Sequence, residues 1–255
     1  MGRVFLGDGN DSIILDRDFP TLALDNLNAI ETGEGDDTIT STGVIDKEGT
    51  IDTDDGNDSI ISQGKFINSG NVFLGDGNDS IIADTDFFNG AIENFNFIGT
   101  GDGNDIITST GVIYNEGVIN TDNGDDSIIV DGGIDGTGTG YGIYNNGGSI
   151  NTGNGNDSII GNEGFESGSH SSGSVFLGDG EDYIKGFGRG DLYGGNGNDI
   201  LELTPGSYTV GIWDTSASFT KGNQLMITSE FEKLIAGSKT YDFTSLTAGQ
   251  IIIVA

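Results

Sequence analysis

The sequence has no cysteine, two prolines, one tryptophan and one histidine. The absence of cysteine excludes disulfides, thiolate metal sites and cysteine nucleophiles. Basic residues are also scarce, since nine Lys and Arg face 41 Asp and Glu and give a formal net charge of −32. Nucleic acids and anionic membrane surfaces require clustered basic residues. We therefore expect neither as a partner.

Apolar sequence is limited as well. Hydrophobic residues make up 34% of the chain, while 46 of the 255 residues are glycine. No stretch has the length and hydrophobicity needed to span a bilayer, and the first residues show no apolar region typical of a cleavable signal peptide. This composition predicts a thin, repetitive core rather than a large globular one.

A short glycine-centred signature recurs nine times along the chain. Its central glycines are Gly9, Gly35, Gly56, Gly77, Gly103, Gly124, Gly155, Gly180 and Gly197. The spacings between them are 26, 21, 21, 26, 21, 31, 25 and 17 residues. Periods of this size are typical of solenoids, and the longer intervals indicate loops inserted into a basic coil, such as residues 163–173.

Three further columns keep the same register. An aspartate stands two residues after every central glycine: Asp11, Asp37, Asp58, Asp79, Asp105, Asp126, Asp157, Asp182 and Asp199. An aliphatic residue follows after two more positions, from Ile13 to Leu201, and another lies five residues before the glycine, from Val4 to Leu192. The alternation around the turn predicts short strands with one inward face. Ile45, Ile67, Ile113 and Ile143 indicate a third side.

The segment from Gly194 to Glu202 carries the clearest family resemblance. It reads Gly-Gly-Asn-Gly-Asn-Asp-Ile-Leu-Glu and resembles the RTX, or haemolysin-type calcium-binding, nonapeptide Gly-Gly-x-Gly-x-Asp-x-U-x, where U is a large aliphatic residue. The other copies keep Gly-x-Asp-x-U. This resemblance implies an all-β parallel β-solenoid, a β-helix or β-roll that we expect to be right-handed, with calcium bound at its turns.

The chain departs from the family in the spacing of its repeats. RTX nonapeptides normally follow one another directly and place calcium turns on both edges of a roll, whereas here only residues 178–202 approach that spacing. In two copies Asp54 and Asp122 also replace the glycine that precedes the central one. We therefore expect one calcium edge on a wider solenoid with degenerate, long coils.

By the resemblance, the nine turn aspartates are direct metal ligands, and the turn glycines frame the sites. These glycines are Gly7, Gly9, Gly33, Gly35, Gly56, Gly75, Gly77, Gly101, Gly103, Gly124, Gly153, Gly155, Gly178, Gly180, Gly195 and Gly197. Elementary electrostatics supports the same reading. Carboxylates stacked at the ~4.8 Å spacing of coils repel one another by roughly 1 kcal/mol per pair even in water, and a divalent cation removes that repulsion.

The remaining turn acids are expected to face solvent and to raise the local calcium concentration. They comprise Asp8, Glu34, Asp36, Asp55, Asp76, Asp102, Asp125, Asp179 and Glu181. With one ion between adjacent turns, and some sites lost to loops or substitutions, we expect about five to eight Ca²⁺ per chain.

The repeat ends near residue 202, which predicts a solenoid over residues 1–202 and a β-rich cap over residues 203–255. The final run from Gln250 to Ala255 is apolar. It resembles the uncleaved C-terminal signal of RTX proteins exported by bacterial type I systems, and it is equally consistent with a last cap strand.

Two other functions compete with a scaffold. A calcium-dependent β-helix polysaccharide lyase, or an epimerase-associated domain, would need clustered cations and a base; here Arg3, Arg17 and Arg189 are far apart in coil order, and His170 lies in a Gly/Ser-rich stretch. An ice-binding RTX-like adhesin would need outward threonines coil after coil. The repeated threonines Thr32, Thr53, Thr100, Thr121 and Thr152 share their position with leucine, which indicates an inward location.

We therefore predict an extracellular or cell-surface calcium-binding module with a structural or adhesive role and no enzymatic activity. Its expected partners are calcium ions, further copies of itself joined end to end or laterally, or a cell-surface polysaccharide. No membrane insertion is expected.

Overall fold

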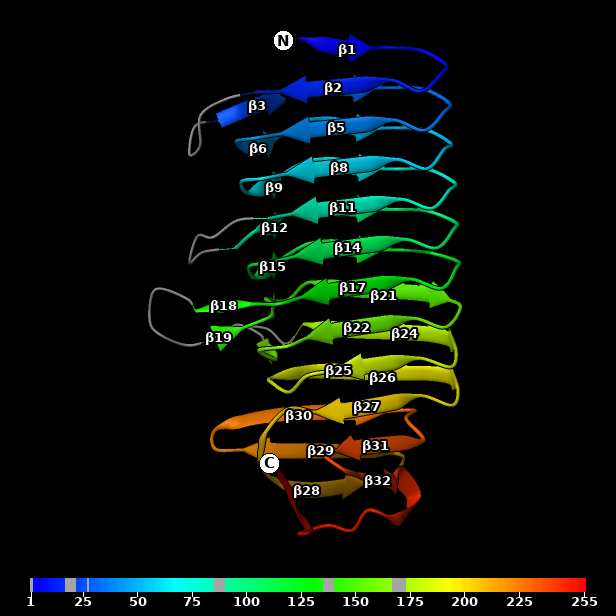
Figure 1. The fold of residues 1–255 in the computed structure, drawn as a ribbon. Coiled ribbons are helices and arrows are strands. Elements are labelled where there is room, and N and C mark those ends of the chain that lie inside the picture. Colours follow the sequence, from blue (N-terminus) through cyan, green and yellow to red (C-terminus); the bar gives the residue numbers. More distant parts are fainter. Residues whose placement is uncertain (1, 17–21, 27, 85–89, 135–139, 167–172) are drawn as a thin grey trace.

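The computed structural model describes residues 2–16, 22–26, 28–84, 90–134, 140–166 and 173–255. The chain winds through successive coils that stack along one axis, and each coil contributes short strands to sheets running the length of the molecule (Figure 1). The pairing between coils is parallel throughout the repeats. The protein is an all-β parallel β-solenoid, as the sequence predicts.

Three long sheets form the sides of the solenoid, and we call them A, B and C. Sheet A contains, in spatial order, β1 (Arg3–Phe5), β4 (Ala29–Glu31), β7 (Thr50–Asp52), β10 (Asn71–Phe73), β13 (Phe97–Gly99), β16 (Val118–Asn120), β21 (Ser149–Asn154), β24 (Ser174–Gly180), β26 (Gly190–Gly197), β30 (Gln224–Ser229), β29 (Ser216–Lys221), β28 (Gly206–Trp213) and β33 (Ile251–Val254).

Sheet B contains β2 (Ser12–Leu15), β5 (Thr38–Ser41), β8 (Ser59–Ser62), β11 (Ser80–Ala83), β14 (Ile106–Ser109), β17 (Ser127–Val130), β22 (Ser158–Gly161), β25 (Tyr183–Lys185), β27 (Ile200–Leu203), β31 (Lys233–Ala236) and β32 (Lys239–Asp242). Sheet C contains β3 (Leu22–Asn26), β6 (Val44–Lys47), β9 (Phe66–Asn68), β12 (Ile92–Asn94), β15 (Ile113–Asn115), β20 (Ile143–Asn145) and β23 (Phe165–Glu166). A hairpin of β18 (Gly133–Ile134) and β19 (Gly140–Tyr141) projects from one coil.

The core consists of one aliphatic column from each sheet. The two columns predicted around the turn pair residue for residue, as in Ile51 with Val72 on sheet A and Ile60 with Ile81 on sheet B. Both columns are confirmed. The third column was predicted one residue out of place in its second member, because Phe66, not Ile67, pairs with Ile45 and is fully buried. Phe66 and Ile67 are adjacent and both apolar, so the sequence alone does not show which of them points inward.

A further inward-facing column, made of polar side chains, lies where sheet C turns into sheet A. It consists of amide side chains that bond from coil to coil, with Asn68 Nδ2 donating to Asn94 Oδ1 at 2.7 Å and Asn94 Nδ2 to Asn115 Oδ1 at 2.8 Å. Lys47 occupies the same column, is fully buried and donates to Asn68 Oδ1 at 2.8 Å. Burial lowers the pKa of Lys47 to about 7. These bonds satisfy polar groups in an otherwise apolar interior.

The C-terminal cap continues the solenoid rather than forming a separate body. The predicted boundary after residue 202 falls inside β27, and the parallel stacking extends one coil further, through β30 on β26 and β31 on β27. Beyond that coil the pairing becomes antiparallel, in β28, β29, β32 and β33. A 3₁₀ turn, η1 (Phe243–Ser245), precedes the last strand. The apolar tail is thus a cap strand, β33, with Ile252 and Val254 buried.

Candidate metal centre

All nine predicted turns stack on one edge of the solenoid, where sheet A passes into sheet B (Figure 1). We call their aspartates the aspartate column. Asp11 in the first coil is partly buried, and the other eight are at most 2% exposed. The column therefore points into the molecule, although it belongs to a polar turn.

From Asp37 onward, each aspartate is tied to the preceding coil by its own side chain. Oδ1 of Asp79 accepts the backbone N–H of Asp58 at 2.7 Å, and Oδ1 of Asp105 accepts that of Asp79 at 2.8 Å. The same bond recurs in every coil, at 2.7 to 2.9 Å. One carboxylate oxygen per turn thus completes the stacking of the backbone.

The other oxygen has no partner. Buried Oδ2 atoms without a hydrogen bond occur on Asp37, Asp58, Asp79, Asp105, Asp126, Asp157, Asp182 and Asp199. In the described part of the chain, the only other buried side-chain oxygens without a partner belong to Thr32 and Thr100, which precede the same turns. An unsatisfied buried polar atom is costly in free energy. Eight such carboxylate oxygens in register therefore need a proton or a cation as a partner.

Electrostatics points to the same need. Burial raises the pKa to about 8 for Asp79 and about 7 for Asp126. It raises the pKa to about 6 for Asp58, Asp157, Asp182 and Asp199, and the neighbouring aspartates add to several of these shifts. The side chains of Thr53 at Asp58 and of Thr121 at Asp126 oppose the rise, as does the N–H bond from the coil before, but together they do not cancel it.

The turn glycines are required by the close stacking of the coils. A Cβ on Gly103 would lie 1.7 Å from the carbonyl oxygen of Gly77, and one on Gly77 would lie 1.6 Å from that of Gly56. Most also have positive φ angles, such as +144° at Gly103. Where the sequence has Asp54 and Asp122 instead of glycine, φ is still +57° and +62°, a conformation that aspartate tolerates.

The outer turn acids are exposed, as predicted. They share their surface with a second ladder that runs in the opposite direction: the N–H of Asn78 donates to Asn57 Oδ1 at 2.9 Å, and that of Asn104 to Asn78 Oδ1 at 2.8 Å. This ladder was not predicted, because asparagine beside glycine reads as an ordinary turn residue.

One further acid ends the aspartate column. The N–H of Asp199 donates to Glu232 Oε2 at 2.7 Å, so a glutamate from the cap takes the place of a tenth turn aspartate. The segment around it imitates a turn, with a left-handed Glu230 at φ +64°. Glu232 was not predicted, because the repeat signature is absent around it. The one signal in the sequence is its position directly before β31.

The donor atoms of the column suit Ca²⁺, a hard cation that prefers carboxylate and carbonyl oxygens. Successive turns are nevertheless in direct contact, since the N–H of Gly77 also donates to the carbonyl of Asp102 at 2.8 Å. Among the described residues, no group of three or more His, Cys, Asp or Glu side chains converges on one point. An ion would therefore bind at the free Oδ2 atoms and complete its shell with carbonyl oxygens or water.

The raised pKa values predict a particular pH dependence in the absence of calcium. The folded column binds protons more tightly than the unfolded chain, so its contribution to stability is fully present below about pH 4 and is lost as pH rises through about 6 to 8. In protein freed of calcium on a chelating resin, the free energy of unfolding should fall by several kcal/mol between pH 5 and pH 8. Denaturant titrations at several pH values would check this.

Asp79→Asn should flatten that pH dependence, because it removes the group with the pKa of about 8. The exposed Asp76→Asn serves as the control and should leave the slope nearly unchanged. Stability that instead rises with pH over this range would contradict the assignment of the column as proton-binding.

Arg17 and His170, which were considered for catalysis, lie outside the described residues. The two other candidates are far apart: Arg3 faces Glu31 at 3.7 Å in the first coils, whereas Arg189 faces Glu166 at 3.7 Å near the last ones. The five repeated threonines are buried, which confirms their inward location, so these five do not form the outward face expected for ice binding.

No family model matches the chain, and no curated protein matches it. Within the described part of the chain, no helix has the length and hydrophobicity of a membrane span.

Proposed function

We propose that the protein is a calcium-stabilised scaffold of the RTX type, secreted or displayed on a cell surface, with a structural or adhesive role. The calcium ions would be held at the Oδ2 atoms of the aspartate column, from Asp11 to Asp199. The chemistry that calcium supplies is charge neutralisation. No reaction is assigned to the protein.

One observation carries this proposal: eight buried carboxylate oxygens without a hydrogen-bond partner stand in register along one edge. Stacking of the coils does not by itself require a carboxylate. Asparagine could make the same Oδ1 bond to the preceding coil without a buried charge. Aspartate occupies the position in all nine turns, although asparagine is frequent beside it. A bound divalent cation accounts for that choice.

The arrangement also accounts for the composition. Each ion would cancel two of the negative charges that give the chain its net charge of −32. A rod whose order depends on calcium folds where calcium is abundant, which favours the extracellular space and export of the unfolded chain. End-to-end or lateral assembly of such rods belongs to the same proposal.

Asp79→Asn tests the role of the column most cleanly. Its amide oxygen still accepts the N–H of Asp58, so the stacking bond is retained while the charge is lost. We expect a lower melting temperature than wild type in millimolar calcium and more residual strand signal than wild type in EGTA at pH 8, because the variant loses an ion but also a buried charge. Circular dichroism measures both, by thermal melts in calcium and by spectra in EGTA.

The matched control is Asp76→Asn, which removes an exposed acid three residues away. It should shift the melting temperature in calcium by no more than a degree or two and should leave the residual strand signal in EGTA unchanged. If Asp79→Asn behaved like Asp76→Asn in calcium, or if it stabilised the protein in both conditions, the aspartate column would not be the calcium site.

A further inference from the structure

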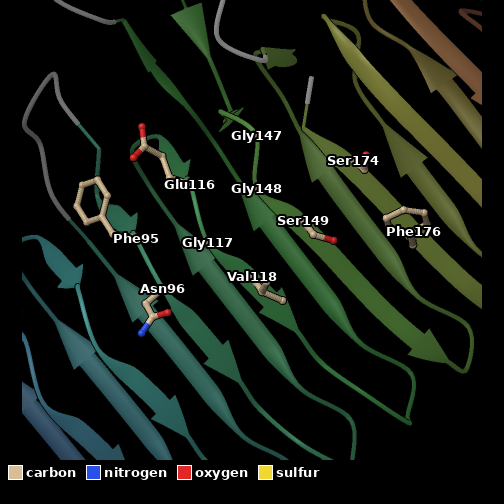
Figure 2. A pocket seen from close by; sticks show the side chains of 10 residues that line it. All are labelled: Phe95, Asn96, Glu116, Gly117, Val118, Gly147, Gly148, Ser149, Ser174 and Phe176. Carbon is tan, nitrogen blue, oxygen red and sulfur yellow. The ribbon is translucent and has the colours of Figure 1, made fainter. Parts of the chain in front are cut away.

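A groove of about 470 Å³ lies on a different edge of the solenoid, where sheet C passes into sheet A (Figure 2). Residues from four successive coils line it, from Phe95 in the first to Phe176 in the last. At the ~4.8 Å spacing of coils, its ends are roughly 14 Å apart along the axis. Phe95 lies two residues before β13 and Phe176 is the third residue of β24, so the groove crosses this edge obliquely, from the sheet C side to the sheet A side.

The floor of the groove is backbone. A Cβ on Gly117 would lie 1.9 Å from the carbonyl oxygen of Asn96, and one on Gly148 would lie 2.7 Å from that of Gly117. Only glycine fits at these positions, so the chain presents backbone to the groove at Gly117 and Gly148 (Figure 2). A ligand lying there would contact the backbone of the stacked coils.

Aromatic rings mark the two ends. Phe95 is 42% exposed and lies 5.9 Å from Tyr114, which is stacked on Tyr144 at 5.1 Å. Phe176 is 41% exposed and is stacked on Tyr193 at 4.7 Å, with an interplanar angle of 8°. Each exposed ring is held in place by a neighbour from the next coil. Rigid, half-exposed rings of this kind are typical of binding sites.

Polar groups stand between the rings. The Glu116 carboxylate accepts from Tyr114 Oη and from Asn146 Nδ2, the latter at 2.7 Å, so it is fixed in orientation. Asn96 and Ser149 add an amide and a hydroxyl to the lining. The walls thus offer flat apolar faces at both ends and hydrogen-bonding groups in the middle.

We propose that this groove binds an uncharged oligosaccharide chain lying obliquely across this edge. The apolar faces of sugar rings pack on aromatic rings, and their hydroxyls bond to carboxylate, amide and hydroxyl groups. Glu116 and the net charge of −32 disfavour an anionic polysaccharide. This inference goes beyond the calcium-stabilised scaffold and uses none of the aspartate column.

Isothermal titration tests it with the full chain in millimolar calcium, after circular dichroism has shown that the protein is folded. The probes are cellohexaose, laminarihexaose and chitohexaose, which are uncharged, and polygalacturonate, which is anionic. At least one uncharged probe should bind saturably, and polygalacturonate should bind at least tenfold more weakly. Phe95→Ala and Phe176→Ala should each weaken the binding about tenfold.

Trp213→Ala is the control, because Trp213 is an exposed aromatic residue of the cap, 56% accessible and not part of the groove. It should leave the affinity unchanged. The proposal is overturned if no uncharged probe binds, if polygalacturonate binds best, or if the two phenylalanine variants bind like wild type. A protein ligand captured by this surface in place of a glycan would overturn it as well. Because folding is monitored separately, these outcomes do not depend on whether calcium is required.

Discussion

Chelation of calcium at pH 8 should abolish most of the strand signal of the solenoid. At that pH Asp58, Asp126, Asp157, Asp182 and Asp199, whose pKa values are about 6 to 7, are largely ionised. Their charges would then be buried without partners, and each pKa unit corresponds to about 1.4 kcal/mol. The core that opposes this cost is thin, since most of it consists of one apolar column per sheet. Far-ultraviolet circular dichroism with EGTA measures the loss.

The unfolding should be reversible and specific. Adding back calcium in excess of the chelator should restore the spectrum, whereas Mg²⁺ should do so poorly because it holds its water shell and demands octahedral geometry. In protein freed of calcium on a chelating resin and held at pH 5, where EGTA itself binds calcium too weakly to be used, much of the strand signal should persist, because protons neutralise the buried carboxylates. A spectrum and melting temperature unchanged by EGTA at pH 8 would show that the ions are not needed for the fold.

Gly103→Ala should destabilise the protein by more than about 4 kcal/mol in the presence of calcium. The added methyl would lie 1.7 Å from the carbonyl oxygen of Gly77, a contact that no side-chain movement relieves, because the opposing atom is backbone. The φ angle of +144° adds strain. Two coils in the middle of the solenoid would have to separate. Denaturant unfolding, or loss of a cooperative transition altogether, would report it.

Gly9→Ala separates the two causes. Gly9 occupies the same position in the first turn with a φ of +122°, but nothing lies within 4 Å of an added Cβ. This variant should show only the conformational strain, about 1 to 2 kcal/mol. Equal effects at Gly9 and Gly103 would mean that the glycine columns serve backbone conformation alone and that the stacking is looser than described.

The fold was accessible from the sequence because the repeat keeps its register at the turn. The columns from Val4 to Leu192 and from Ile13 to Leu201 follow from counting residues from each central glycine, whatever the length of the loops elsewhere. The third side lies beyond those loops, where no fixed count applies. That is why Ile67 was chosen over Phe66.

The hydrogen-bonded ladders could not be predicted from the sequence in the same way. Alternation identifies the aspartate column, but not that Asp105 Oδ1 accepts the N–H of Asp79 while its Oδ2 stays free. The amide ladder of Asn68, Asn94, Asn115 and Asn145 does carry a signal, since each asparagine ends a strand of sheet C. This ladder was not predicted, because an asparagine at the end of a strand is equally typical of a turn.

The most direct measurement of the central claim is the number of calcium ions bound per chain. Equilibrium dialysis of the full chain at pH 7.5, with free calcium varied, should give about five to eight ions. They should bind cooperatively, because each ordered coil is a template for the next. One or two independent sites, or binding that equimolar Mg²⁺ abolishes, would contradict the account. The aspartate column would then serve only to link successive coils by hydrogen bonds.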